Sequence, residues 1–280
     1  MFGSPLLTKL IDLALEEDLA WGDVTSELCV SEKQKASARL IAREDLLVCG
    51  LPIIQQIVSR AKSSVQVNLK KSEGTWAKEG EVLAELRGLA REILALERSI
   101  LNFLQRMSGV ASAAAQAQKL AGKILVLDTR KTTPGWRVLE KYAVRCGGAH
   151  SHRFSLGDMI LVKNNHIDAC KGNLRALLTT LFQKKPAYMP VEVEVRNLKE
   201  LKQALQFPVD VVMLDNFSND EIATCMPLIR SKAPSPTVEA SGGITAERLK
   251  KLSRLGIDTV SMGALTTQAT NKDISLRIKI

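Results

Sequence analysis

The apolar and polar positions of this chain change their pattern about 110 residues from its start. Ser4 and Pro5 predict the cap and the first position of an N-terminal helix that ends near residues 21–23. Residues 36–86 predict strands joined by turns. Residues 89–107 carry apolar side chains at spacings of three and four, which predicts a long amphipathic helix.

From residue 110 onward, short apolar runs alternate with helical stretches, which is typical of repeated βα units. Most of these runs are rich in Val, Ile and Leu, as expected of parallel strands covered on both faces. The predicted strands are 124–128, 159–163, 191–195, 210–215, 237–240 and 258–262.

These units are too few for a complete eight-unit barrel, which needs about 250 residues. The α/β region therefore predicts an incomplete (open) TIM-like α/β barrel or an open doubly wound sheet, and residues 110–269 would form this catalytic domain. Residues 1–109 predict a separate N-terminal α+β sandwich domain, to which residues 270–280 return.

Composition narrows the classes of function. The net charge of +9 favours anionic partners, but aromatic residues make up only 4% and do not interleave with basic ones, which argues against a single-strand nucleic-acid binder. No apolar run reaches the length of a membrane span, and the N-terminus does not resemble a signal peptide. The five cysteines are widely spaced with no C-x-x-C pair, which fits a reducing cytoplasm.

Acidic residues stand out at the ends of two predicted strands, where functional groups lie in α/β barrels. Glu192 and Glu194 share one face of their strand. Glu194 and Asp215 should lie at similar heights on adjacent strands. Because buried carboxylates are costly without cations, they form either a buried ion-pair network or a pair that holds ribose hydroxyls or a hydrated Mg²⁺.

Basic residues gather between residues 128 and 163. Those expected to point into the barrel mouth are Arg130, Arg153 and Lys163, whereas Arg137, Lys141 and Arg145 fall on a helix at 136–146 and are expected to be solvated. Arginine matches carboxylates bidentately, and lysine suits phosphate as a point charge. The pattern predicts a site for an anionic substrate.

The histidines and glycines add two further candidates. His150, His152 and His166 lie close together in the sequence, which raises the question of zinc. Cys146 is a weak fourth ligand, so a histidine that hydrogen-bonds an anionic ligand is the favoured alternative. Ser241-Gly242-Gly243 and Gly263-Ala264 follow the last two strands, where backbone amides often bind phosphate.

These motifs resemble the quinolinate phosphoribosyltransferase family, also called nicotinate-nucleotide pyrophosphorylase (carboxylating). The resemblance covers nearly the whole chain and is densest in DTRKTTPG, GGAHSHR and KNNH, with VEVEV, VVMLDNF, VEASGGIT and VSMGALT further on. It implies transfer of phosphoribosyl from phosphoribosyl pyrophosphate (PRPP) to quinolinate, with release of pyrophosphate and CO₂, giving nicotinate mononucleotide for NAD biosynthesis. It also implies Mg²⁺ and assembly as a dimer or a larger oligomer, of which a homodimer is expected. Together with the composition, we expect a cytoplasmic protein with no organic cofactor and no nucleic-acid or membrane partner.

The resemblance also implies roles for individual residues. Those expected to grip the quinolinate carboxylates are Arg130, His152, Arg153 and Lys163, with Arg98 from a partner subunit. Those expected to approach the pyrophosphate are Lys131 and Lys163. Glu194 and Asp215 would hold the ribose and, through water, the metal. The 5′-phosphate would lie on Ser241, Gly242, Gly243, Gly263 and Ala264.

The chain departs from the family pattern at Asn164, where many relatives have an acid, at Thr267, where many have His, and at Ala149 and Ser151. One rival is a paralogous pyrophosphorylase with another acceptor, which the intact H-x-H-R and K-x-N-H stretches disfavour. The other is a basic RNA-binding module, which is disfavoured because the charge gathers at strand ends.

Overall fold

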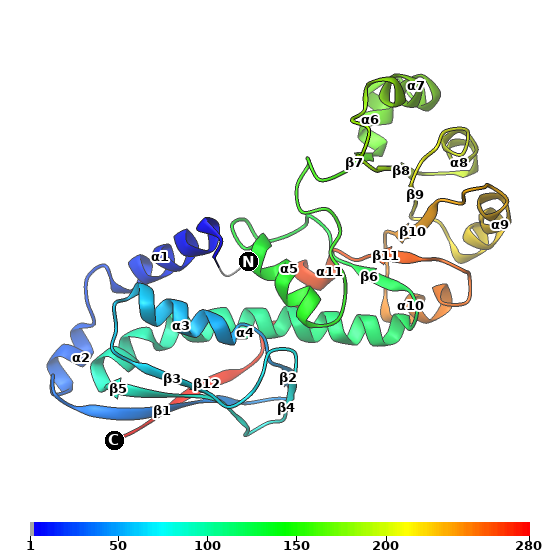
Figure 1. Ribbon diagram of the computed structural model, residues 1–280. Coiled ribbons are helices and arrows are strands. Elements are labelled where there is room, and N and C mark those ends of the chain that lie inside the picture. Colours follow the sequence, from blue (N-terminus) through cyan, green and yellow to red (C-terminus); the bar gives the residue numbers. More distant parts are fainter. Residues whose placement is uncertain (1–2) are drawn as a thin grey trace. The chain divides into compact units, whose positions relative to one another are not determined.

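The computed structural model describes residues 3–280, which form two compact units (Figure 1). The first unit comprises the described residues up to 116, together with 132–148 and 264–280. The second unit comprises residues 117–131 and 149–263. The domain limits expected from the sequence, 1–109 with 270–280 and 110–269, stay a prediction.

An antiparallel sheet forms the base of the first unit, in the order β12-β1-β5-β3. Its strands are β1 (Lys35–Ala42), β3 (Gln66–Leu69), β5 (Val82–Leu89) and β12 (Ile274–Lys279). A second pair consists of β2 (Leu46–Leu47) and β4 (Trp76–Ala77). Leu40 and Leu86 are fully buried, so the larger sheet turns one face toward the core.

The helices of the first unit differ from the sequence predictions in several respects. They are α1 (Pro5–Leu19), α2 (Val24–Cys29), α3 (Leu51–Arg60), α5 (Arg137–Cys146), α11 (Ala264–Thr267) and most of α4 (Ala90–Ala121). Pro5 begins α1 as predicted, but the Ser4 side chain makes no cap hydrogen bond. Helix α4 runs past residue 107 because alanine, the best helix former, dominates its last turns. Helix α2 was not predicted, and neither was helix α3 within 36–86.

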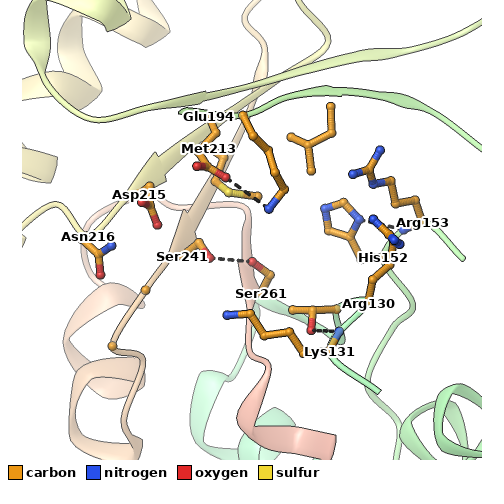
Figure 2. Close-up of a pocket in the computed structure, with 15 residues that line it drawn as sticks. Arg130, Lys131, His152, Arg153, Glu194, Met213, Asp215, Asn216, Ser241 and Ser261 are labelled. Atoms are coloured by element: carbon orange, nitrogen blue, oxygen red, sulfur yellow. Dashed lines mark hydrogen bonds and ion pairs between the residues drawn. The ribbon is translucent and has the colours of Figure 1, made fainter. Parts of the chain in front are cut away.

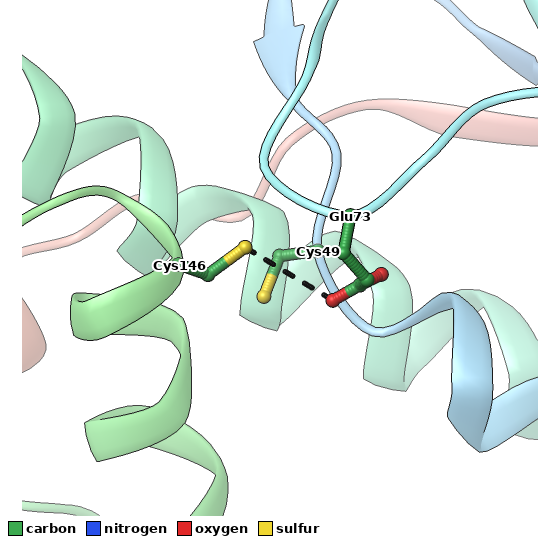
Figure 3. A group of neighbouring side chains, drawn as sticks. All are labelled: Cys49, Glu73 and Cys146. Atoms are coloured by element: carbon green, nitrogen blue, oxygen red, sulfur yellow. Dashed lines mark hydrogen bonds between the residues drawn. The ribbon is translucent and has the colours of Figure 1, made fainter.

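Glu73 explains how α3 is anchored. Its carboxylate accepts hydrogen bonds from the backbone N–H groups of Gly50 (2.9 Å) and Leu51 (2.7 Å) at the start of α3, and from the hydroxyl of Tyr142 (2.7 Å) on α5. Figure 3 shows the same carboxylate beside Cys49 and Cys146, with Cys146 Sγ 4.0 Å from Glu73 Oε2. The Glu73 side chain, which comes from a turn distant in sequence, therefore accepts hydrogen bonds from backbone N–H groups at the start of α3 that have no partner within the helix.

We expect Glu73→Ala to lower the free energy of unfolding by about 2–3 kcal/mol, because three buried or half-buried donors lose a charged acceptor at once. Urea unfolding followed by circular dichroism measures this change. Glu79→Ala is the matched control, since Glu79 lies in an exposed turn of the same unit. Equal stability of the Glu73 and Glu79 variants would contradict the anchoring role.

The second unit contains a parallel sheet in the order β6-β11-β10-β9-β8-β7. Its strands are β6 (Leu125–Leu127), β7 (Ile160–Val162), β8 (Val191–Val195), β9 (Val211–Asp215), β10 (Thr237–Ser241) and β11 (Thr259–Ser261). Each predicted strand is present, with its ends within one residue of the prediction. Central side chains such as Val193, Val212 and Val260 are fully buried, which explains the continuous apolar runs.

The predicted open α/β barrel is confirmed. β6 and β7 occupy the two outer positions of the sheet and do not pair with each other, so the row of strands stays open. The connecting helices are α6 (Asn164–Ala169), α7 (Leu174–Lys184), α8 (Leu198–Ala204), α9 (Asn219–Arg230) and α10 (Ala246–Leu252). Figure 1 shows α7 to α10 on the outer side of the strands, which places the strand ends around a common mouth.

Candidate active site

A cavity of about 710 Å³ opens at the carboxyl ends of the parallel strands in the second unit (Figure 2). Of the site residues predicted from the sequence, those that line it are Arg130, Lys131, His152, Arg153, Lys163, Glu194, Asp215, Ser241, Gly242 and Gly243. The remaining lining residues were not predicted: Thr129, Leu161, Met213, Asn216 and Ser261. The strand ends thus bring together residues that are more than 100 positions apart in the sequence.

Three predicted site residues lie outside this lining. Arg98 is exposed on α4, and Ala264 begins α11. Gly263 lies beside the cavity, because a Cβ atom there would come within 2.9 Å of Lys131 Cδ. Gly263 therefore leaves room for the Lys131 side chain, which Figure 2 shows among the cavity residues.

Two guanidinium groups dominate one end of the cavity. Arg130 and Arg153 approach from the segment after β6 and from the segment before β7, on the same side as His152 (Figure 2). Burial, and next the nearby positive charge of Arg130, lower the pKa of Arg153. Mutual repulsion of two arginines is relieved by an anion between them, so this end suits a carboxylate-bearing ligand.

The helical cations near this segment do not all behave as predicted. Arg145 is exposed on α5, but Lys141 is only 1% exposed, so the prediction that Lys141 is solvated was wrong. Lys141 shares the inward face of α5 with Val144, one turn further along the helix.

Two acidic side chains, Glu194 and Asp215, also line the cavity. Glu194 pairs in register with Met213, so Asp215 lies two residues further along its strand, and the two acids are not at the similar heights that were predicted. Asn164 contacts both acids: its backbone N–H lies 3.4 Å from Glu194 Oε1, and its Nδ2 lies 3.4 Å from Asp215 Oδ2. Lys163 Nζ lies 3.5 Å from Glu194 Oε2.

This acidic group fits a divalent cation. Asn164 Oδ1 is buried without a hydrogen-bond partner, and it lies beside two carboxylates. Carboxylate and amide oxygens are ligands that Mg²⁺ accepts, usually with several waters. The family departure at Asn164 therefore removes a charge but keeps an oxygen at this position.

The three histidines do not form one metal site. His150 and His166 are exposed, and His166 Nδ1 accepts a hydrogen bond from the Lys163 backbone N–H at the start of α6. His152 Nε2 instead lies 3.1 Å from Glu192 Oε2 and 3.8 Å from Glu239 Oε2. Glu192 is thus buried against His152, whereas Glu194 lines the cavity.

Glu239 was missed in the sequence, although a signal was present. It is the only charged residue in the predicted strand at 237–240, and it is 2% exposed. An acid in such a strand needs a polar partner, and that partner comes from a distant segment.

The glycine loop after β10 forms the other end of the cavity. Gly242 has φ +84°, and a Cβ atom there would lie 2.1 Å from Asn216 Oδ1, so only glycine fits under the Asn216 side chain. Arg248 fastens the loop: its guanidinium donates to the carbonyl oxygen of Gly242 at 2.6 Å and also to that of Phe217. Ser261 Oγ donates to Ser241 Oγ at 3.0 Å. This end presents backbone and hydroxyl groups suited to phosphate oxygens.

Comparison with known proteins agrees with this geometry. The family model described as "Quinolinate phosphoribosyl transferase, N-terminal domain" matches residues 23–108, and the model of the C-terminal domain of the same family matches residues 109–277. The chain belongs to the quinolinate phosphoribosyl transferase family. The resemblance stated from the sequence motifs is thereby confirmed.

Individual members of the quinolinate phosphoribosyl transferase family match over nearly their full length. The probable nicotinate-nucleotide pyrophosphorylase [carboxylating] of Bacillus subtilis is 37% identical, over 98% of this chain and 94% of that protein. The crystal structure of NadC from Streptococcus pyogenes is 34% identical with a TM-score of 0.91, covering 99% of this chain and 98% of that one. The nicotinate-nucleotide pyrophosphorylase structure from Francisella tularensis is 36% identical with a TM-score of 0.89, covering 98% and 96%.

Within residues 3–280, no helix combines the length and apolar character needed to cross a membrane.

Proposed function

We propose that this protein transfers the phosphoribosyl group of PRPP to quinolinate and decarboxylates the product to nicotinate mononucleotide. The observation that carries the proposal is the cavity itself, which brings together Arg130 and Arg153, the acids Glu194 and Asp215, and the glycine loop after β10. That combination matches a dicarboxylate acceptor, a ribose and a 5′-phosphate.

The acceptor is positioned by positive charge. The residues proposed to meet its two carboxylates are Arg130, Arg153 and Lys163, while Lys131 and Lys163 meet the pyrophosphate of the donor. Guanidinium groups bind carboxylates through paired hydrogen bonds, which fixes the ring plane of the acceptor. The two carboxylates thereby place the ring nitrogen toward the ribose, which is the requirement for attack.

The transfer step is electrostatic. Pyrophosphate leaves C1 of the ribose, and Lys131 and Lys163 stabilise the charge that develops on it. The ribose becomes oxocarbenium-like, and Glu194 and Asp215 stabilise it while they hold its hydroxyl groups. The ring nitrogen of quinolinate then forms the bond to C1. The bond between the ring and the adjacent carboxylate then breaks: CO₂ leaves, the bonding electron pair stays on the ring carbon beside the pyridinium nitrogen, and that carbon takes up a proton from solvent. No protein nucleophile takes part.

We further propose Mg²⁺ as the metal that accompanies PRPP. Glu194, Asp215 and the unpartnered oxygen of Asn164 would hold it through direct or water-mediated contacts. Bound Mg²⁺ supplies positive charge that neutralises the pyrophosphate leaving group.

The proposed assembly is a homodimer in the cytoplasm, in which Arg98 of one subunit reaches the acceptor of its partner. An apolar groove of about 720 Å³ beside the outer strand β7 supports self-association, because its lining includes Leu156, Met159 and Leu177. Leu156 is 69% exposed, and exposed apolar patches of this kind mark protein interfaces.

The test is an assay of nicotinate mononucleotide formed from quinolinate, PRPP and Mg²⁺. We expect turnover with quinolinate and, because a monocarboxylate forfeits half of the charged contacts, at least about a 100-fold lower kcat/KM with nicotinate. Nicotinamide is the uncharged control. Equal activity with nicotinate would refute the dicarboxylate assignment. Salt-dependent RNA binding without turnover would favour a polyanion-binding function instead.

A further inference from the structure

The imidazole of His152 is held by protein atoms on both sides at the wall of the cavity (Figure 2). Its Nδ1 accepts a 2.7 Å hydrogen bond from the backbone N–H of Arg153, and its Nε2 lies 3.1 Å from Glu192 Oε2. A ring nitrogen that accepts a hydrogen bond carries no proton, so the proton of the ring must be on Nε2. The geometry thus specifies a neutral ring that donates to Glu192.

The surroundings of Nε2 favour this proton position. Glu239 Oε2, which lies 3.5 Å from Thr259 Oγ1, faces the same nitrogen from 3.8 Å. Burial, followed by the charge of Glu192, raises the pKa of Glu239 to about 7. Apolar side chains would fill this space at lower cost than buried acids. Packing therefore does not account for the cluster.

We propose that Glu192 is a positioning residue that fixes His152 as the Nε2–H tautomer, so that Nδ1 holds the backbone of Arg153 and aims its guanidinium into the cavity. His152 then acts through Arg153 and directs no N–H toward the acceptor. The resemblance implied instead that His152 grips a carboxylate itself. This inference rests on the proposed function only for the identity of the acceptor, because the tautomer belongs to the free protein.

The tautomer can be read by long-range ¹H–¹⁵N NMR of histidine-labelled protein at neutral pH, after dialysis against a chelator. The sequence has only three histidines, so the His152→Gln spectrum assigns the signal. We expect the Nε2–H form in the natural protein and in Glu192→Gln, because an amide oxygen still accepts from Nε2. We expect a mixture of tautomers in Glu192→Ala.

Three spectral results would overturn the inference. The first is protonation of both ring nitrogens of His152 in the natural protein, which would make it a cation available to the acceptor. The second is an unchanged Nε2–H form in Glu192→Ala. The third is a shift of the His152 signal on addition of Zn²⁺, which would assign His152, Glu192 and Glu239 to a metal site.

Kinetics provide the second measurement. We expect Glu192→Ala to raise KM for quinolinate about tenfold, the effect of one displaced hydrogen-bonded contact, with KM for PRPP unchanged. Glu192→Gln should restore the KM of the natural protein. A parallel rise in both KM values with a lower melting temperature would show a merely structural role and overturn the inference. An inactive natural protein with the expected tautomer would refute the proposed function but not the role of Glu192.

Discussion

Arg153→Ala is expected to raise KM for quinolinate about 100-fold, because a half-buried guanidinium that meets a carboxylate contributes on the order of 3 kcal/mol. The side chain lies at the cavity wall, and it also donates to the carbonyl oxygen of Met159 at 3.3 Å. Its KM for PRPP should change little, since the glycine loop lies at the other end of the cavity. Steady-state kinetics with each substrate varied in turn measure the difference.

The matched control is Arg254→Ala, which removes the same charge from an exposed position of the second unit. Its KM values should stay at those of the natural protein. Circular dichroism and the melting temperature show whether the Arg153 variant folds. If Arg153→Ala prevented folding, Arg153 would be a structural residue, and if both variants weakened quinolinate binding equally, net charge alone would explain the effect.

Gly242→Ala is expected to lower kcat/KM for PRPP by about 10- to 100-fold, since a non-glycine residue at positive φ costs about 1–3 kcal/mol and displaces the loop. The backbone there has φ +84°, and the added Cβ would lie 2.1 Å from Asn216 Oδ1. KM for quinolinate should stay within about twofold, because its contacts come from other loops. Initial rates at varied PRPP measure the effect.

The double variant Gly242→Ala/Asn216→Gly separates the two causes. Asn216 itself has φ 58°, so glycine keeps its backbone conformation while removing the side chain that the new Cβ would strike. Part of the activity should return, and the remaining loss reports the backbone strain at Gly242. PRPP kinetics of the single variant equal to those of the natural protein would contradict the phosphate role of this loop.

The sequence predicted the catalytic sheet well because its signals are local. Most strands from β6 to β11 are rich in buried Val, Ile and Leu, and such runs are visible without knowing their partners. The open barrel follows from the number of these runs. In contrast, the helix α3 was missed although Leu51, Ile54 and Val58 recur at helical spacing, because the whole segment 36–86 was interpreted as strands and turns.

The site was predictable where its residues stand at strand ends, and it was not where distant segments meet. Arg130, Lys163 and Asp215 were placed correctly because topology alone carries them to one edge. The contact of His152 with Glu239 depends on packing of the segment between β6 and β7 against β10, which lies far away in the chain. Asn216 and Arg248 serve the loop after β10 through contacts that no spacing in the sequence reveals.

The fastening of the glycine loop bears on how this enzyme can be altered. Arg248 and Asn216 hold the loop after β10, whereas Glu192 and His152 hold Arg153 at the opposite end, and the two groups have no residue in common. The residues that contact one substrate can therefore be mutated without removing the contacts that position the residues for the other substrate. Libraries aimed at new aromatic acids should leave Arg248 and Asn216 unchanged. Libraries aimed at new sugar donors should leave Glu192 and His152 unchanged.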